Sequence, residues 1–84
     1  MTTITSTDSH QMLRFGALVA KKDDRFALES AAENLAVSLL EGDVHQNNHL
    51  TWEFAEGVRN NRDGMYHYDA IMARLKDRAI ELAY

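Results

Sequence analysis

The stretch FALESAAENLAVSLLEGD, residues 26–43, decides the fold class of this chain. Its apolar residues recur three and four positions apart, which is the period of a helix with one broad buried face. Those residues are Leu28, Ala31, Ala32, Leu35, Leu39 and Leu40. Asp23 or Asp24 supplies a cap before the pattern, and Gly42 ends it. We therefore predict a buried helix whose alanines let another helix approach closely.

The composition of the whole chain favours helices on both sides of this one. None of the 84 residues is proline, the strongest helix breaker. The hydrophobic fraction of 45% and the charged fraction of 26% are typical of a soluble globular domain, and a chain this short has room for one core. The sequence predicts an all-α fold, a small bundle of three to four helices, with a flexible lead over residues 1–7 and a single helical domain over residues 8–84.

Two further helices flank the central one in the prediction. The first runs from about residue 8 to residue 21 and begins at a capping box. Gly16 inside it costs helix stability, so we interpret this glycine as the mark of a close helix crossing. A short helix from about 50 to 59 follows the central one, with Asn47 or Asn48 as its cap.

The last predicted helix covers about residues 67–83 and carries more apolar surface than one face requires. One stripe has a spacing of four, three, four and three, which suits packing against the other helices. It consists of Tyr68, Met72, Leu75, Ala79 and Leu82. Ile71, Ile80 and Tyr84 lie off this stripe. We therefore predict that these three residues mediate self-association if the protein forms a homodimer.

Several classes of protein are disfavoured by absent features. The sequence contains no cysteine, so disulfides and thiolate metal sites are not expected. It shows neither a signal peptide nor an apolar run long enough for a membrane span, so we expect a cytoplasmic protein that does not bind membranes.

Catalysis and metal binding find little support in the residue pattern. His45 and His49 are four residues apart but flank QNN, which reads as a loop, and no third ligand is close in sequence. No nucleophile stands beside a base in a recognisable arrangement. We expect a non-enzymatic protein without metal or cofactor, and a small metal-dependent enzyme is the third alternative.

Charge is distributed very unevenly along the chain. Residues 26–58 contain six acidic residues and no lysine or arginine, whereas residues 1–25 and 59–84 each carry a net charge of +1. The formal charge of −4 therefore comes from the middle, and direct nucleic-acid binding is not expected. Two interpretations stay open: the flanking helices neutralise these carboxylates, or the carboxylates remain free and attract a positively charged partner.

The stretch EGDVHQNNHLTWEFAEG, residues 41–57, contains the only tryptophan and neither lysine nor arginine. On a helix, Trp52 would point away from Leu50 and Phe54, because a step of two residues turns the chain by about 200°. It either packs inside the bundle or anchors a partner with a surrounding acidic rim. The predicted partner-binding residues are Trp52, Glu53, Glu56, Glu41, Asp43 and Asn47.

These observations favour binding over chemistry. The leading hypothesis is a small acidic helical adaptor or inhibitor that binds a basic surface of a partner protein, a type common among accessory proteins of phages and mobile elements. The second hypothesis is a structural homo-oligomer that pairs through its C-terminal helix. Neither hypothesis rests on a family motif.

Overall fold

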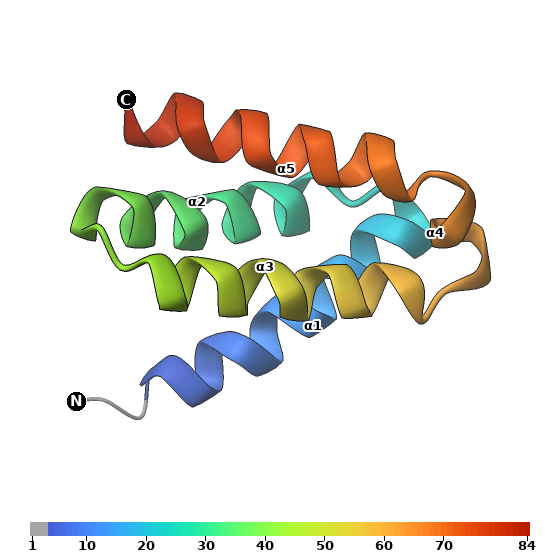
Figure 1. Ribbon diagram of the computed structural model, residues 1–84. Helices are drawn as coiled ribbons and strands as arrows, with labels where there is room; N and C mark the ends of the chain where they lie inside the picture. Colours follow the sequence, from blue (N-terminus) through green and yellow to red (C-terminus); the bar gives the residue numbers. More distant parts are fainter. Residues whose placement is uncertain (1–3) are drawn as a thin grey trace.

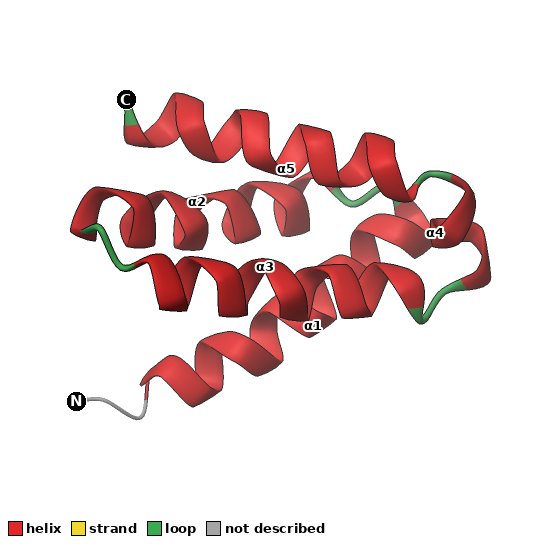
Figure 2. Ribbon diagram, in the orientation of Figure 1, coloured by secondary structure: helices red, strands yellow, loops and turns green. Residues whose placement is uncertain are grey.

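The computed structural model describes the backbone of residues 4–84 and the side chains of residues 10–62 and 65–84. Within this part of the chain there are five helices and no strand (Figures 1 and 2). They are α1 (Ile4–Lys22), α2 (Arg25–Glu41), α3 (Val44–Arg59), α4 (Arg62–Tyr66) and α5 (Tyr68–Ala83). Four long helices and one short helix form a small bundle, which confirms the predicted all-α fold.

The helices associate mainly in two pairs. α1 crosses α3 and makes its most extensive contacts there, while α5 lies along α2 and runs in the same direction (Figure 1). α2 also contacts both helices of the other pair, so it holds the pairs together. α3 and α5 contact each other only sparsely. The surface between α3 and α5 is therefore a place where two long helices lie beside each other without close packing.

The crossing of α1 and α3 depends on two glycines. A Cβ atom added to Gly16 would collide with the carbonyl oxygen of Phe54, and one added to Gly57 would collide with the carbonyl oxygen of Leu13. The two backbones are therefore in direct contact at this point. This confirms the prediction that Gly16 marks a close helix crossing.

α2 forms the centre of the bundle, as most of its sequence pattern predicts. The exception is Leu40, which the pattern places on the buried face and the structure leaves exposed. Ala27, Ala31, Ala32 and Leu35 are buried in the core. The carboxylate of Asp24 caps the helix by accepting a hydrogen bond of 3.1 Å from the backbone N–H of Ala27. Gly42 ends the helix in the left-handed conformation, with φ of 72°, which an amino acid with a side chain rarely adopts.

α3 begins six residues earlier than predicted, and the expected asparagine cap is wrong. Asp43 caps the helix instead, because its Oδ1 accepts a hydrogen bond of 2.9 Å from the backbone N–H of Gln46. Asn47 lies inside the helix and donates from Nδ2 to Oγ of Ser38, 2.9 Å away. The asparagine-rich segment is thus helical, and one of its amides ties α3 to α2.

α1 also begins earlier than predicted, at Ile4 rather than near residue 8. Residues 4–7 contain neither glycine nor proline, so nothing in them stops the helix. The predicted flexible lead therefore overlaps α1 over residues 4–7. Its first three residues lie outside the described part of the chain.

Charged side chains tie α5 to α2 at the surface. Arg78 donates from Nε and Nη2 to the two carboxylate oxygens of Glu29, both 2.9 Å away, and from Nη1 to Glu81 at 2.9 Å. Arg74 pairs with Asp23 at 3.1 Å, in the turn before α2. A two-pronged arginine–carboxylate pair fixes geometry better than a single contact, so Arg78 helps to set the register of α5 on α2.

This pair makes a prediction about acid stability. The hydrogen bonds from Arg78 hold the pKa of Glu29 below its usual value. Because the folded pKa is lower than the unfolded one, the contribution of the pair is full above the unfolded pKa and is lost as pH falls. We expect Glu29→Gln to be less stable than the wild type at neutral pH, with a gap that narrows in acid. Urea unfolding at a series of pH values measures the difference in unfolding free energy between the two proteins. A difference that does not change with pH would contradict the prediction.

None of the helices in the described part of the chain combines the length and the apolar character needed to cross a membrane.

Candidate protein-binding surface

Trp52 lies on the outside of α3. Leu50, Phe54 and Val58, on the opposite side of the helix, are fully or almost fully buried, whereas 59% of the Trp52 surface is exposed. This is the arrangement expected from the 200° turn between residues two positions apart. It confirms that Trp52 points away from the apolar stripe. Trp52 therefore lies on the surface and not inside the bundle.

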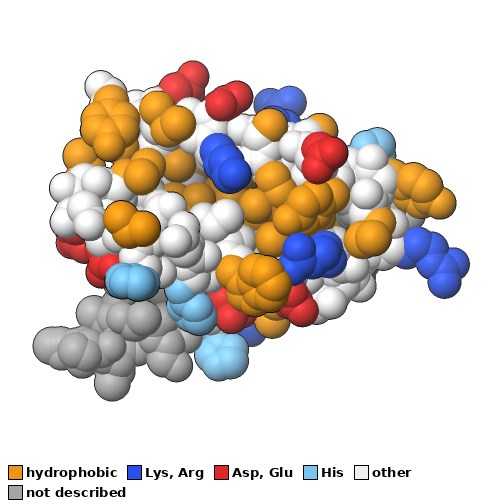
Figure 3. Space-filling view, in the orientation of Figure 1, with side chains coloured by type: hydrophobic (Ala, Val, Ile, Leu, Met, Phe, Trp, Pro, Cys, Tyr) orange, Lys and Arg blue, Asp and Glu red, His pale blue; other side chains and the backbone are white. Residues whose placement is uncertain are grey.

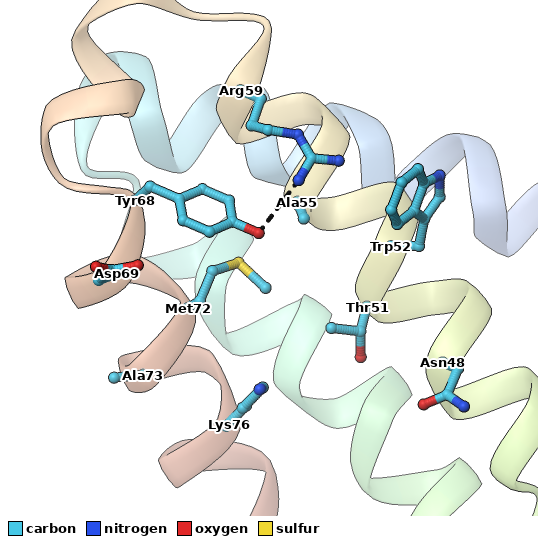
Figure 4. Close-up of a pocket in the computed structure, with 10 residues that line it drawn as sticks. All are labelled: Asn48, Thr51, Trp52, Ala55, Arg59, Tyr68, Asp69, Met72, Ala73 and Lys76. Carbon is cyan, nitrogen blue, oxygen red and sulfur yellow. Dashed lines mark hydrogen bonds between the residues drawn. The ribbon is translucent and has the colours of Figure 1, made fainter.

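The indole of Trp52 is held in place by Arg59, which follows it by two helical turns (Figure 4). The guanidinium carbon of Arg59 lies 4.9 Å from the centre of the Trp52 ring and 5.7 Å from the centre of the Tyr68 ring. Its Nη1 donates to the hydroxyl of Tyr68 at 3.4 Å, and its Nη2 pairs with Glu56 at 3.0 Å. The hydrogen bond with Glu56 raises the pKa of Arg59. An arginine guanidinium is charged at every physiological pH, so both rings face a positive charge.

A groove of about 510 Å³ runs beside Trp52, between α3 and α5. Buried Ala55 and Met72 lie at its base, and Trp52 and Lys76 stand on opposite walls (Figure 4). Figure 3 shows apolar side chains in the middle of this face, with basic side chains on either side of them. The lining consists of Asn48, Thr51, Trp52, Ala55, Arg59, Tyr68, Asp69, Met72, Ala73 and Lys76. We call this feature the α3–α5 groove.

Two neighbouring hollows extend the α3–α5 groove in both directions. One shares Thr51 and Lys76 with it and reaches Ile80 near the end of α5. The other shares Asp69 and reaches Met65 on α4. The surface between the two walls is therefore longer than the central groove and open along its length, unlike an enclosed ligand pocket, which buries most of a small molecule.

The predicted acidic rim does not assemble around Trp52. Asp43 lies nine residues before Trp52, about 13.5 Å along the helix axis at 1.5 Å per residue. Glu41 is farther still along the chain, at the end of α2. Only Glu53 and Glu56 are close to Trp52 in sequence, and Glu56 is already paired with Arg59.

Asn47 does not belong to an exposed rim either. Its side-chain amide donates to Oγ of Ser38 and to the carbonyl oxygen of Leu35, at 2.9 Å and 3.4 Å. Ser38 is the buried polar residue of the described core, and its own hydroxyl donates to Leu35. The amide of Asn47 is thus used to join α3 to α2.

The carboxylates of the acidic middle segment fall into two groups. Glu29 pairs with Arg78 on α5, and Glu56 pairs with Arg59 on its own helix. The remaining four form no ion pair with any side chain that the structure describes: Glu33, Glu41, Asp43 and Glu53. Intramolecular neutralisation therefore accounts for two of the six carboxylates and leaves the others exposed or partly exposed.

His45 and His49 lie one turn apart on α3, so the interpretation of their segment as a loop is wrong. Both side chains are exposed. Among the side chains that the structure describes, no three histidine, cysteine, aspartate or glutamate residues come together in a way that could hold a metal ion.

The three residues predicted for self-association have different environments. Ile80 and Tyr84 are exposed, Ile80 to 52%. The prediction for Ile71 is wrong, because only 6% of its surface is exposed. Ile71 precedes Leu75 by one helical turn and therefore faces the core with it.

Sequence reasoning missed Arg59, Tyr68 and Lys76 as parts of this surface. The spacing of seven between Trp52 and Arg59 was a usable signal, because it places both on one face of a helix. No local signal marked Tyr68 and Lys76, which reach the groove from α5. Comparison of the chain with known protein families, curated proteins and solved structures gave no match.

Proposed function

We propose that this protein is a non-enzymatic adaptor or inhibitor that binds a basic surface of a partner protein, with Trp52 as the anchor. One observation carries the proposal: a tryptophan that is 59% exposed stands on the wall of an open groove and is held there by Arg59. Large aromatic side chains are over-represented among the residues that dominate protein–protein binding energy.

The fixed position of the indole supports this role. A side chain that is already ordered loses less conformational entropy when a partner binds, so more of its contact energy appears as affinity. The contact with Arg59, whose charge is in turn held by Glu56, restricts Trp52 in the free protein. The Trp52 side chain therefore loses little further conformational entropy when a partner binds.

The charge of the protein supports a basic partner. The chain has a formal charge of −4. Four carboxylates of its middle segment are not used in ion pairs with described side chains, namely Glu33, Glu41, Asp43 and Glu53. Such a distribution accelerates encounters with a positively charged surface and does so less at high salt. The carboxylates would act mainly over distance, since most of them lie away from Trp52.

Affinity isolation from extracts of the source cells, followed by titration of the purified partner, tests the proposal. We expect Trp52→Ala to weaken binding by about 2 kcal/mol, or roughly 30-fold. Phe26→Ala is the matched control, because Phe26 is an exposed aromatic on α2 outside the groove. Wild-type binding should also weaken as salt rises. Equal binding by the wild type and Trp52→Ala would exclude the anchor, and binding that is insensitive to salt would exclude a basic partner surface.

A further inference from the structure

Four exposed residues of α5 form a straight row along the wall of the α3–α5 groove. Asp69, Ala73, Lys76 and Ile80 follow one another at spacings of four, three and four, which places them on one side of the helix. The side chains of Asp69 and Lys76 form no ion pair with any described residue. This row is therefore an unpartnered helix face with one free negative and one free positive charge.

The order of charges in the row is self-complementary. Asp69 and Lys76 are seven residues apart, or about 10.5 Å along the axis. When two copies of α5 lie antiparallel about a twofold axis near Ala73, Asp69 of each copy faces Lys76 of the other. A twofold interface makes every contact twice, so two opposite-charge pairs form, and the row of each copy contributes no net charge.

An apolar residue continues the row beyond these charges. Four residues past Lys76, Ile80 of one copy extends beyond Asp69 of the other, toward the hollow between α4 and α5. Met65 lines the hollow that continues the groove in that direction, together with Asp69 and Tyr68. Ile80 and Met65 are exposed to 52% and 58% in the single chain. A contact between them would cover one apolar side chain from each copy at both ends of the row.

From this match of charge and apolar surface we infer that the α3–α5 groove binds a second copy of this chain, through antiparallel contact of the two α5 helices. Ala73 lies at the centre, where its small side chain lets the helices approach closely. The inference goes beyond the proposed function, because it names a second copy as an occupant of the groove. Trp52 lines the same groove, so self-association and binding of a partner protein would compete for this surface.

Charge reversal tests the register. Lys76→Asp would bring two aspartates together at both ends of the contact, and we expect the dimer to weaken at least about tenfold in sedimentation equilibrium. Asp69→Lys would do the same with two lysines. An equimolar mixture of these two variants should form a heterodimer, because every facing pair is then of opposite charge. Asp77→Lys, one residue off the row, is the control and should dimerise as the wild type does.

Cross-linking tests the centre of the contact. The chain contains no cysteine, so Ala73→Cys introduces a single thiol that forms a disulfide only with another copy. We expect oxidation to convert this variant into a covalent dimer, whereas Val37→Cys, exposed on α2, should stay monomeric on a denaturing gel. Circular dichroism shows whether each variant is folded. A monomeric wild type at millimolar concentration, or a Lys76→Asp variant that dimerises like the wild type, overturns the inference.

Discussion

Gly57→Ala is expected to destabilise the protein by about 3 kcal/mol or more, which for a domain of this size lowers the melting temperature by roughly 12 °C or more. The added methyl group would collide with the carbonyl oxygen of Leu13, and it would also press on the backbone nitrogen of Ala17. Backbone atoms of a helix cannot turn aside as a flexible side chain can. The variant must therefore separate α1 from α3, which opens the most extensive helix contact in the protein.

Gly42→Ala provides the matched control, because the chemical change is identical. Gly42 has a positive φ, but a Cβ atom there would meet nothing within 4 Å. Its replacement costs only the backbone strain of the left-handed conformation, about 1–2 kcal/mol. Thermal unfolding followed by circular dichroism compares the two variants, and Gly16→Ala should resemble Gly57→Ala. If Gly57→Ala and Gly42→Ala have the same melting temperature, the backbones of α1 and α3 do not cross as closely as described.

The parts of the fold that were predictable are those that local patterns determine. α2 combines a long apolar period, an aspartate before it and a glycine after it, and each of these signals acts within a few residues. The structure places Asp24 and Gly42 in the two capping roles. Gly16 was also informative, because a glycine inside a helix is costly unless something needs the space.

The beginning of α3 could not be found in this way. Asparagine and histidine are mediocre helix formers, so the segment that contains Asn47 resembles a loop when it is read alone. In the folded chain, Asp43 caps the helix and the amide of Asn47 bonds to Ser38 on α2. The second of these interactions joins two helices, so the sequence around Asn47 alone could not reveal it.

The candidate site shows the same division. The outward direction of Trp52 follows from helix geometry alone, and it was predicted correctly. The groove beside it needs walls from α3 and α5, which are brought together only because both pack on α2. The carboxylates of the predicted acidic rim are spread out for the same reason: Glu41 ends α2, whereas Trp52 lies well inside α3.

Phe54→Ala is expected to destabilise the protein far more than Trp52→Ala, although the two residues are separated by a single position on α3. Phe54 is fully buried and is among the largest side chains of the core, so its truncation leaves a cavity and should cost about 3–5 kcal/mol of unfolding free energy. Trp52 is exposed, and its truncation should cost only its contact with Arg59, about 0.5–1 kcal/mol.

Urea unfolding of the two variants, followed by the far-ultraviolet circular dichroism signal of the helices, compares their stability with that of the wild type. A small loss for Trp52→Ala together with a large loss for Phe54→Ala shows that α3 divides its two aromatic residues between core and surface. Comparable losses would mean that Trp52 supports the fold, and the segment around it would then be a packed structural element rather than a binding surface. A Trp52 ring that contributes little to folding keeps its exposed surface available for contact with a partner.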